Sequence, residues 1–161
     1  SLHDALPIFL RTLSPIPASV VIARGNSSQT GVGWEEIDIF TATTYDEGHV
    51  YNGSGRIQPG GSEGDGLWLV YGKIRISSGI AAGDIIRLSV TRFDSGGTAQ
   101  ARQYIEQEAV GTADNMLQVI GAHTLTFTSG DYIALEAFSS SASWSINTTN
   151  LNMFVAFKLL V

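Results

Sequence analysis

The chain has 161 residues, which fits a single domain able to bury roughly 68–70% of its unfolded surface. Hydrophobic residues make up 43% of the sequence and charged residues 15%, a balance too apolar for disorder, and the 18 glycines suit a protein rich in turns. The net charge is −6 and the nine Lys and Arg residues are scattered, which argues against nucleic-acid binding. There is no cysteine for disulfides or thiolate chemistry, and no apolar run approaches the ~20 residues of a membrane helix.

The start of the chain, SLHDALPI at residues 1–8, resembles translated sequencing-adapter sequence of the kind that enters metagenomic assemblies. It lacks the basic start and apolar run of a signal peptide. Residues 1–17 are therefore expected to be a non-native or linker segment, stiffened by Pro15 and Pro17. A native disordered terminus is the alternative. The globular domain is expected over residues 18–161.

Alternation of apolar and polar residues dominates the domain and predicts strands, with no convincing amphipathic helix. Residues 99–110 are ambiguous because Ala, Gln, Arg and Glu favour helix, yet the DSGG turn at 94–97 favours a returning strand. We expect that strand. Roughly eight to ten strands predict an all-β, two-sheet antiparallel sandwich or jelly roll. The expected strands are 18–24, 34–40, 66–77, 83–93, 99–110, 116–127, 131–138, 143–147 and 151–160.

Two of these strands, 66–77 and 151–160, are apolar on both faces, although a strand in a two-sheet sandwich has only one core to face. Trp68 is expected in the core. A second apolar face in an antiparallel fold favours a subunit interface, and a loop or the upstream segment covering that face is the alternative. The expected interface residues are Leu67, Leu69, Tyr71, Phe154, Ala156 and Leu160.

No catalytic group is assigned. Ser62 in GGSEG (60–64) matches G-x-S-x-G, but a strand rather than a helix follows, so no nucleophile elbow is expected. Neither His49 nor His123 belongs to an H-x-H pair, and His123 is expected to be a hydrogen-bonded structural residue. The sequence therefore predicts neither an enzyme nor a cofactor.

The run YDEGH (45–49) gathers two carboxylates and an imidazole, which we interpret as a polar turn. Calcium bound by Asp46 and Glu47 is the weaker alternative, because the run lacks EF-hand spacing. Trp34 and Trp144 stand at strand starts, where ligand stacking and packing are comparably plausible. The candidate ligand-binding residues are Trp34, Asp46, Glu47, His49 and Trp144.

Four segments carry a family resemblance. GLWLVYG (66–72), TLTFTSGDYIALEA (124–137), NMFVAFKLL (152–160) and the WEEIDIF…YDEG order resemble the superfamily of complement component 1q globular heads and tumour necrosis factor, especially its bacterial and bacteriophage branch. Ala156 replaces a usual glycine. The resemblance spans about residues 18–161. It implies a ten-strand jelly roll, a homotrimer, and a non-enzymatic head that binds proteins or glycans through loops, sometimes with calcium.

The collagen-like Gly-x-y stalk of many animal members is missing from the sequence, which favours a phage or bacterial structural protein. We expect the head of a tail, fibre or capsid appendage, virion-borne or extracellular. Its partners would be copies of itself and a host-surface glycan or protein, with neither nucleic acid nor membrane. A secreted, monomeric bacterial carbohydrate-binding β-sandwich is the alternative.

Overall fold

The computed structural model describes residues 20–25, 28–40, 42–46, 51–58, 65–111, 115–126, 129–141, 143–147 and 152–159, and these contain twelve strands. All pair antiparallel. In chain order they are β1 (Val20–Arg24), β2 (Gln29–Gly31), β3 (Glu35–Glu36), β4 (Ala42–Asp46), β5 (Arg56–Ile57), β6 (Gly66–Ser78), β7 (Ile85–Phe93), β8 (Ala99–Glu108), β9 (Asn115–Leu125), β10 (Tyr132–Ser139), β11 (Trp144–Ile146) and β12 (Met153–Leu159).

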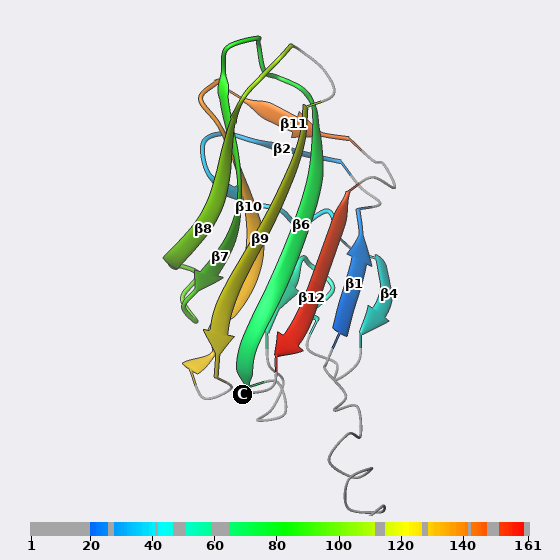
Figure 1. The fold of residues 1–161 in the computed structure, drawn as a ribbon, viewed down its shortest axis with the longest axis vertical. Helices are drawn as coiled ribbons and strands as arrows, with labels where there is room; N and C mark the ends of the chain where they lie inside the picture. Colours follow the sequence, from blue (N-terminus) through cyan, green and yellow to red (C-terminus); the bar gives the residue numbers. More distant parts are fainter. Residues whose placement is uncertain are drawn as a thin grey trace, which may run out of the picture.

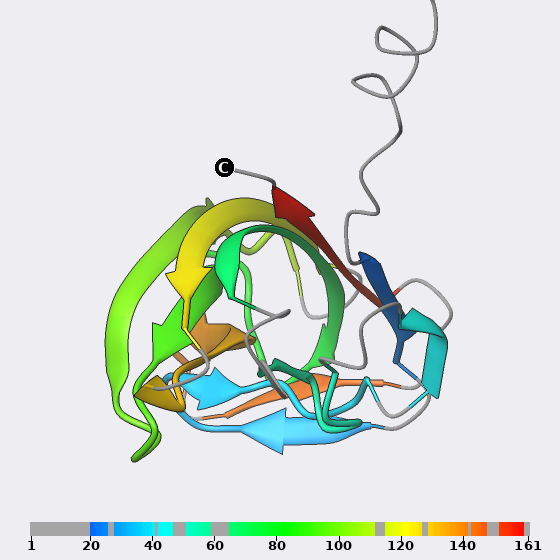
Figure 2. The same cartoon turned by 90° about the horizontal axis from the view of Figure 1, so that it is seen from below.

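Two sheets form a jelly-roll sandwich, as the alternation predicts. One sheet has seven strands in the order β2-β11-β6-β12-β1-β4, with β9 paired to β6, and the other has five in the order β3-β10-β7-β8, with β5 paired to β10. Figure 1 shows β9, β6, β12 and β1 side by side, and Figure 2, seen along the strands, shows the layers facing each other. No helix in the described ranges is long and apolar enough to cross a membrane.

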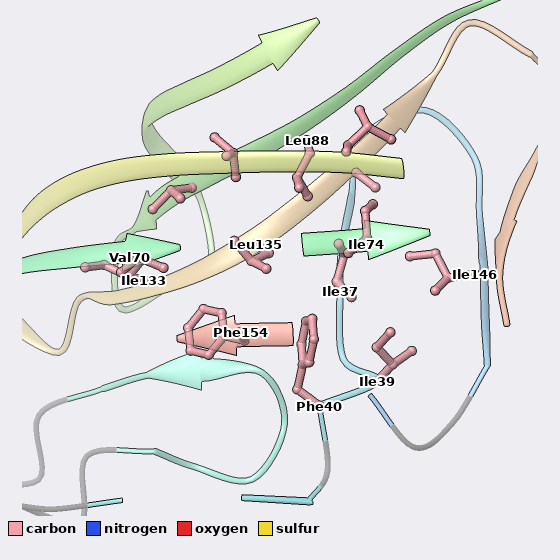
Figure 3. Packing of buried hydrophobic residues seen from close by; sticks show 14 of the residues in the cluster. Ile37, Ile39, Phe40, Val70, Ile74, Leu88, Ile133, Leu135, Ile146 and Phe154 are labelled. Carbon is pink, nitrogen blue, oxygen red and sulfur yellow. The ribbon is translucent and has the colours of Figure 1, made fainter. Parts of the chain in front are cut away.

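The core lies between the two sheets and holds the inward residues of each strand. Trp68 of β6 is fully buried, as expected. Gly72 of the same strand lets the layers approach, because a Cβ there would lie 2.6 Å from a methyl carbon of Leu135 on β10. Figure 3 shows Phe40 and Phe154 packed together, with ring centroids 5.7 Å apart.

The expected strand 34–40 forms a ladder only at Glu35 and Glu36. The following residues run into the core instead: Ile37, Ile39 and Phe40 are fully buried, and the backbone nitrogen of Ile37 donates to the Leu135 carbonyl at 2.8 Å. Burial of both Ile39 and its neighbour Phe40 departs from strict alternation, which explains why a pattern-based strand is too long here.

The strand expected at 99–110 is confirmed by β8, which pairs with β7 along its whole length. The DSGG turn before it is also confirmed. Gly97 has a φ of 81° and donates to the Asp94 carbonyl at 3.0 Å, a backbone shape that favours glycine. The boundary expected at residues 17 and 18 lies outside the described residues.

The prediction for the two faces of β12 is wrong. Phe154 and Ala156, expected in a subunit interface, are fully buried in the core of the single chain. Phe157 and Leu159, on the opposite face and not among the expected interface residues, are 40% and 38% exposed. The register explains the inversion: Phe154 pairs with inward Gly72 of β6, whereas Phe157 pairs with outward Leu69.

Candidate functional site

The outer face of the seven-stranded sheet carries a continuous set of apolar side chains across β12, β6 and β9. Three cross-strand rows make it up: Leu159–Leu67–Thr124, Phe157–Leu69–Ala122 and Val155–Tyr71–Ile120. We call this surface the apolar face and define it by Leu67, Leu69, Tyr71, Ile120, Ala122, Val155, Phe157 and Leu159. Ile120 is 65% exposed, which is unusual for a large apolar residue in the middle of a sheet.

Three of the six expected interface residues, Leu67, Leu69 and Tyr71, lie on the apolar face and are half-buried. The sixth, Leu160, lies outside the described residues. Ile120 and Phe157 also belong to the apolar face, but the sequence analysis did not predict them as interface residues. Ile120 could have been found, because it alternates with His123 and Val119, which point inward on β9.

One end of the apolar face turns polar. In the next row Lys73 of β6 lies between Met153 of β12 and Gln118 of β9. The Tyr71 hydroxyl donates to Gln118 Oε1 at 2.9 Å, so the tyrosine presents its ring to the apolar rows and its hydroxyl to this polar end.

The outer face of the five-stranded sheet is different, because charged and aromatic side chains cover it. Glu136 of β10 is only 4% exposed, accepts bonds of 2.6 Å and 3.0 Å from Arg102 of β8, and accepts one of 2.6 Å from the Thr91 hydroxyl. The hydrogen bond to Glu136 raises the pKa of Arg102. This network satisfies a carboxylate that would otherwise be costly to bury.

Trp34, a candidate stacking platform, belongs to that covering layer. Its ring centroid lies 5.3 Å from that of Phe138 and 6.1 Å from that of Tyr104, and the Arg102 guanidinium carbon lies 5.0 Å from it. Trp34 is half-buried. Since these side chains already pack against the indole, the structure gives it a packing role and leaves only part of the ring for a ligand.

Trp144, the other candidate platform, is fully buried. Its Nε1 donates to the Gly33 carbonyl at 3.1 Å, and its ring fills the space that a Cβ at Gly31 would need. The expectation that it contacts a ligand is therefore corrected: Trp144 is a core residue whose polar atom is satisfied internally.

The YDEGH run contributes one described side chain, Asp46 at the end of β4. Its Oδ2 accepts a hydrogen bond from the Tyr51 backbone nitrogen at 3.3 Å, which links the end of β4 to Tyr51. Glu47 and His49 lie outside the described residues. Within the described residues no three His, Asp or Glu side chains are grouped as metal ligands would be.

His123 is the structural histidine expected from the sequence. It is 7% exposed, and its Nε2 lies 3.0 Å from the Val90 carbonyl of the opposite sheet. Burial lowers its pKa, the hydrogen bond to Val90 opposes that change, and the charge of Arg92 adds to it. The ring links β9 to β7.

A polar pocket of about 310 Å³ lies where β3 meets the turn before β5. We call it the polar pocket; it is lined by Glu36, Asp38, Asn52, Ser54 and Arg56. Asp38 alternates with Glu36 on the outward side of this segment, a pattern visible in the sequence. Asn52, Ser54 and Arg56 were missed, because nothing in the sequence says that β3 and β5 pair along the same strand, β10.

The Glu36 carboxylate accepts three hydrogen bonds in the pocket. Arg56 donates to it through Nε at 2.5 Å and Nη2 at 3.1 Å, and the Tyr132 hydroxyl donates at 3.2 Å. The hydrogen bond to Glu36 raises the pKa of Arg56. Burial, helped by the Glu36 charge, raises the pKa of Tyr132 to about 12, so this hydroxyl keeps its proton and remains a donor.

No family model matches the sequence, and no curated protein is significantly similar to it. Solved structures are similar in fold. Murine APRIL at pH 5.0 superimposes with a TM-score of 0.62 at 13% identity, covering 88% of this chain and 99% of that one. Eiger TNF from S. frugiperda gives 0.57 at 14% identity, covering 90% and 94%. The globular domain of zebrafish complement 1qA protein gives 0.54 at 12% identity, covering 88% and 98%.

These likenesses extend over nearly the whole of each structure, so they concern the complete sandwich and not a shared hairpin. At such low identity they establish the fold alone. The architecture expected from the sequence is confirmed: this chain folds as a jelly roll of the tumour necrosis factor and complement 1q type.

Proposed function

We propose that this domain is a non-enzymatic head that assembles as a homotrimer through the apolar face. The observation that carries the proposal is the contiguous apolar surface over the strands β12, β6 and β9, with Ile120 65% exposed. A surface of this kind on a single chain favours a protein interface. Likeness in fold to a tumour necrosis factor and to a complement 1q globular domain supports the same reading.

The biological setting in this proposal is a phage or bacterial structural protein, with the head on a tail, fibre or capsid appendage. The head would serve in assembly and in binding a surface receptor, on a virion or outside the cell, with a host glycan or protein as partner. Genes for tail or capsid proteins beside the coding sequence would support this setting, and genes for carbohydrate-degrading enzymes would favour the monomeric carbohydrate-binding module.

The interface is tested by a matched pair of substitutions at exposed, apolar positions. Ile120→Asp places a charge in the apolar face, whereas Val110→Asp places the same charge beyond the end of β8, where Val110 is 82% exposed. Because a carboxylate is costly to bury, Ile120→Asp is expected to give monomers in sedimentation-velocity runs, and Val110→Asp to remain trimeric. Circular dichroism checks that both variants fold. A folded Ile120→Asp variant that sediments as the wild type would overturn the proposed interface.

A further inference from the structure

We propose that the polar pocket binds a polyhydroxylated ligand, a saccharide unit of a surface glycan. This inference rests on the surface-binding part of the proposed function and assigns it a place, but it does not depend on the apolar face. The pocket lies on the outer side of the five-stranded sheet, because Glu36 and Arg56 pair with the outward residues Glu136 and Ala134 of β10. The other sheet carries the apolar face.

Pairing with β10 brings the two halves of the pocket together. β3 supplies Glu36 and leads into Asp38, while the turn before β5 supplies Asn52, Ser54 and Arg56. Since both short strands lie along one edge of β10, side chains from residues 36 to 56 meet at one place on the surface.

The turn that forms the pocket wall is fixed without a ligand. Asn52 Oδ1 accepts from the backbone nitrogens of Ser54 at 2.9 Å and Arg56 at 3.3 Å. Gly55 has a φ of 80°, and a Cβ at this position would lie 2.4 Å from the Ile37 carbonyl oxygen, so only glycine lets the turn approach β3 this closely. A ligand would therefore meet a wall already in place, which lowers the entropy cost of binding.

Arg56 and Glu36 fix the floor of the pocket. Besides its two hydrogen bonds to Glu36, the Arg56 guanidinium lies 4.4 Å from the Tyr132 ring centroid, and that ring stacks on Phe93 with centroids 4.9 Å apart. Gln29 holds the backbone on the other side: its side chain donates to the Glu36 carbonyl at 2.6 Å and accepts from the Asp38 nitrogen at 3.0 Å.

Several polar groups in the pocket remain available. Among the described residues, the Asp38 carboxylate, the Asn52 side-chain nitrogen and the Ser54 hydroxyl take part in no hydrogen bond. They offer one strong acceptor, one amide donor and one hydroxyl that does both. The residues that carry these three groups line the same cavity from two different segments of the chain.

The chemistry of the lining selects the class of ligand. The five lining residues are all polar, so a ligand held by apolar burial has little to gain. Phosphate or sulfate would face the carboxylates of Glu36 and Asp38. Because Arg56 neutralises only Glu36, the Asp38 carboxylate would repel such an anion. Adjacent hydroxyl groups donate to a carboxylate and accept from an amide, and a volume of about 310 Å³ lies at the small end of ligand pockets, near ~300 Å³. A monosaccharide unit meets these conditions.

The test is a titration of the ¹⁵N-labelled protein with neutral monosaccharides (D-glucose, D-galactose, D-mannose and N-acetylglucosamine) at millimolar concentrations. At least one sugar is expected to shift the amide signals of residues 36–38 and 52–56 with saturation. Asp38→Asn, which keeps the shape and removes the charge, is expected to weaken that binding by about tenfold, because hydrogen bonds to a charged group are the stronger kind. Glu108→Gln, across the sheet on β8, is the matched control and should bind as the wild type.

Each other outcome counts against the inference. Saturation of the same amides by calcium chloride but by none of the sugars would identify a cation site, and unaltered binding by Asp38→Asn would remove the carboxylate from the site. Absence of shifts with all four sugars would also overturn it. Light scattering on the same sample distinguishes failure of one proposal from failure of the other. A trimer that binds no sugar would refute only the proposed sugar site, and a monomer that binds sugar would refute only the proposed trimer.

Discussion

Phe154 and Phe157 lie three residues apart on β12, and the structure gives them opposite roles. Phe154 is fully buried, with ring centroids 5.7 Å from Phe40 and 6.0 Å from Tyr51. Truncating a buried Phe to Ala removes its transfer free energy and leaves a cavity, a loss of about 3–5 kcal/mol. Phe157 is 40% exposed and packs on the sheet surface, so its truncation should cost a single chain roughly 1–2 kcal/mol.

Urea denaturation at several protein concentrations separates these effects. With a slope of roughly 2 kcal/mol per molar urea, Phe154→Ala should lower the midpoint by about 2 M at every concentration. Phe157→Ala should act mainly by weakening assembly, so its midpoint should depend on protein concentration and, under dissociating conditions, lie only about 0.5–1 M below the wild-type value. Equal losses in the two variants at the lowest protein concentration would refute the assignment of the two faces of β12.

Three further outcomes are expected from polar side-chain contacts, two between the sheets and one within the five-stranded sheet. The Gln103 side chain donates to the Ala122 carbonyl at 2.7 Å and accepts from the Ala122 backbone nitrogen at 2.8 Å. Gln103→Leu should therefore lower the free energy of unfolding by about 1–3 kcal/mol. A neutral effect in thermal denaturation would contradict this prediction. The pKa of His123 is lowered in the folded state, so below the usual histidine pKa of 6.5 the unfolded state binds more protons than the folded state. The free energy of unfolding should therefore fall as the pH drops through 6.5. His123→Gln should flatten that part of the pH profile of stability. Arg102→Met should destabilise the fold by about 1–3 kcal/mol, a value discounted because the arginine side chain is 36% exposed. Adding Glu136→Gln should restore much of the lost stability. If the losses of the two single variants simply add in the double variant, the two residues are not coupled.

Alternation predicts an element well when one face is polar. β7 and β9 alternate clearly, and residues 99–108 were found as a strand because no apolar stripe supported a helix. β12 is apolar on both faces, so period two alone does not tell core from surface. Its register against β6 decides that question, and register depends on pairing between residues far apart in the chain.

The candidate sites, like the two faces of β12, depend on pairing between residues that are far apart in the chain. Asp46, Glu47 and His49 attract attention because they are neighbours in the sequence, yet the Asp46 carboxylate accepts a hydrogen bond from the Tyr51 backbone. The polar pocket joins Glu36 to Arg56, twenty positions apart, through a strand that follows some 80 residues later. Trp144 was misplaced for a comparable reason: the space that it fills exists because Gly31, on β2, has no side chain.

The central claim, that the apolar face joins copies of this chain, is tested most directly by the molar mass of the wild-type protein in solution. Size-exclusion chromatography with multi-angle light scattering should give three chains of 17.2 kDa each, and dilution should leave that mass unchanged over the measurable range. A single species of 17.2 kDa at all concentrations would contradict the account and favour a monomeric module.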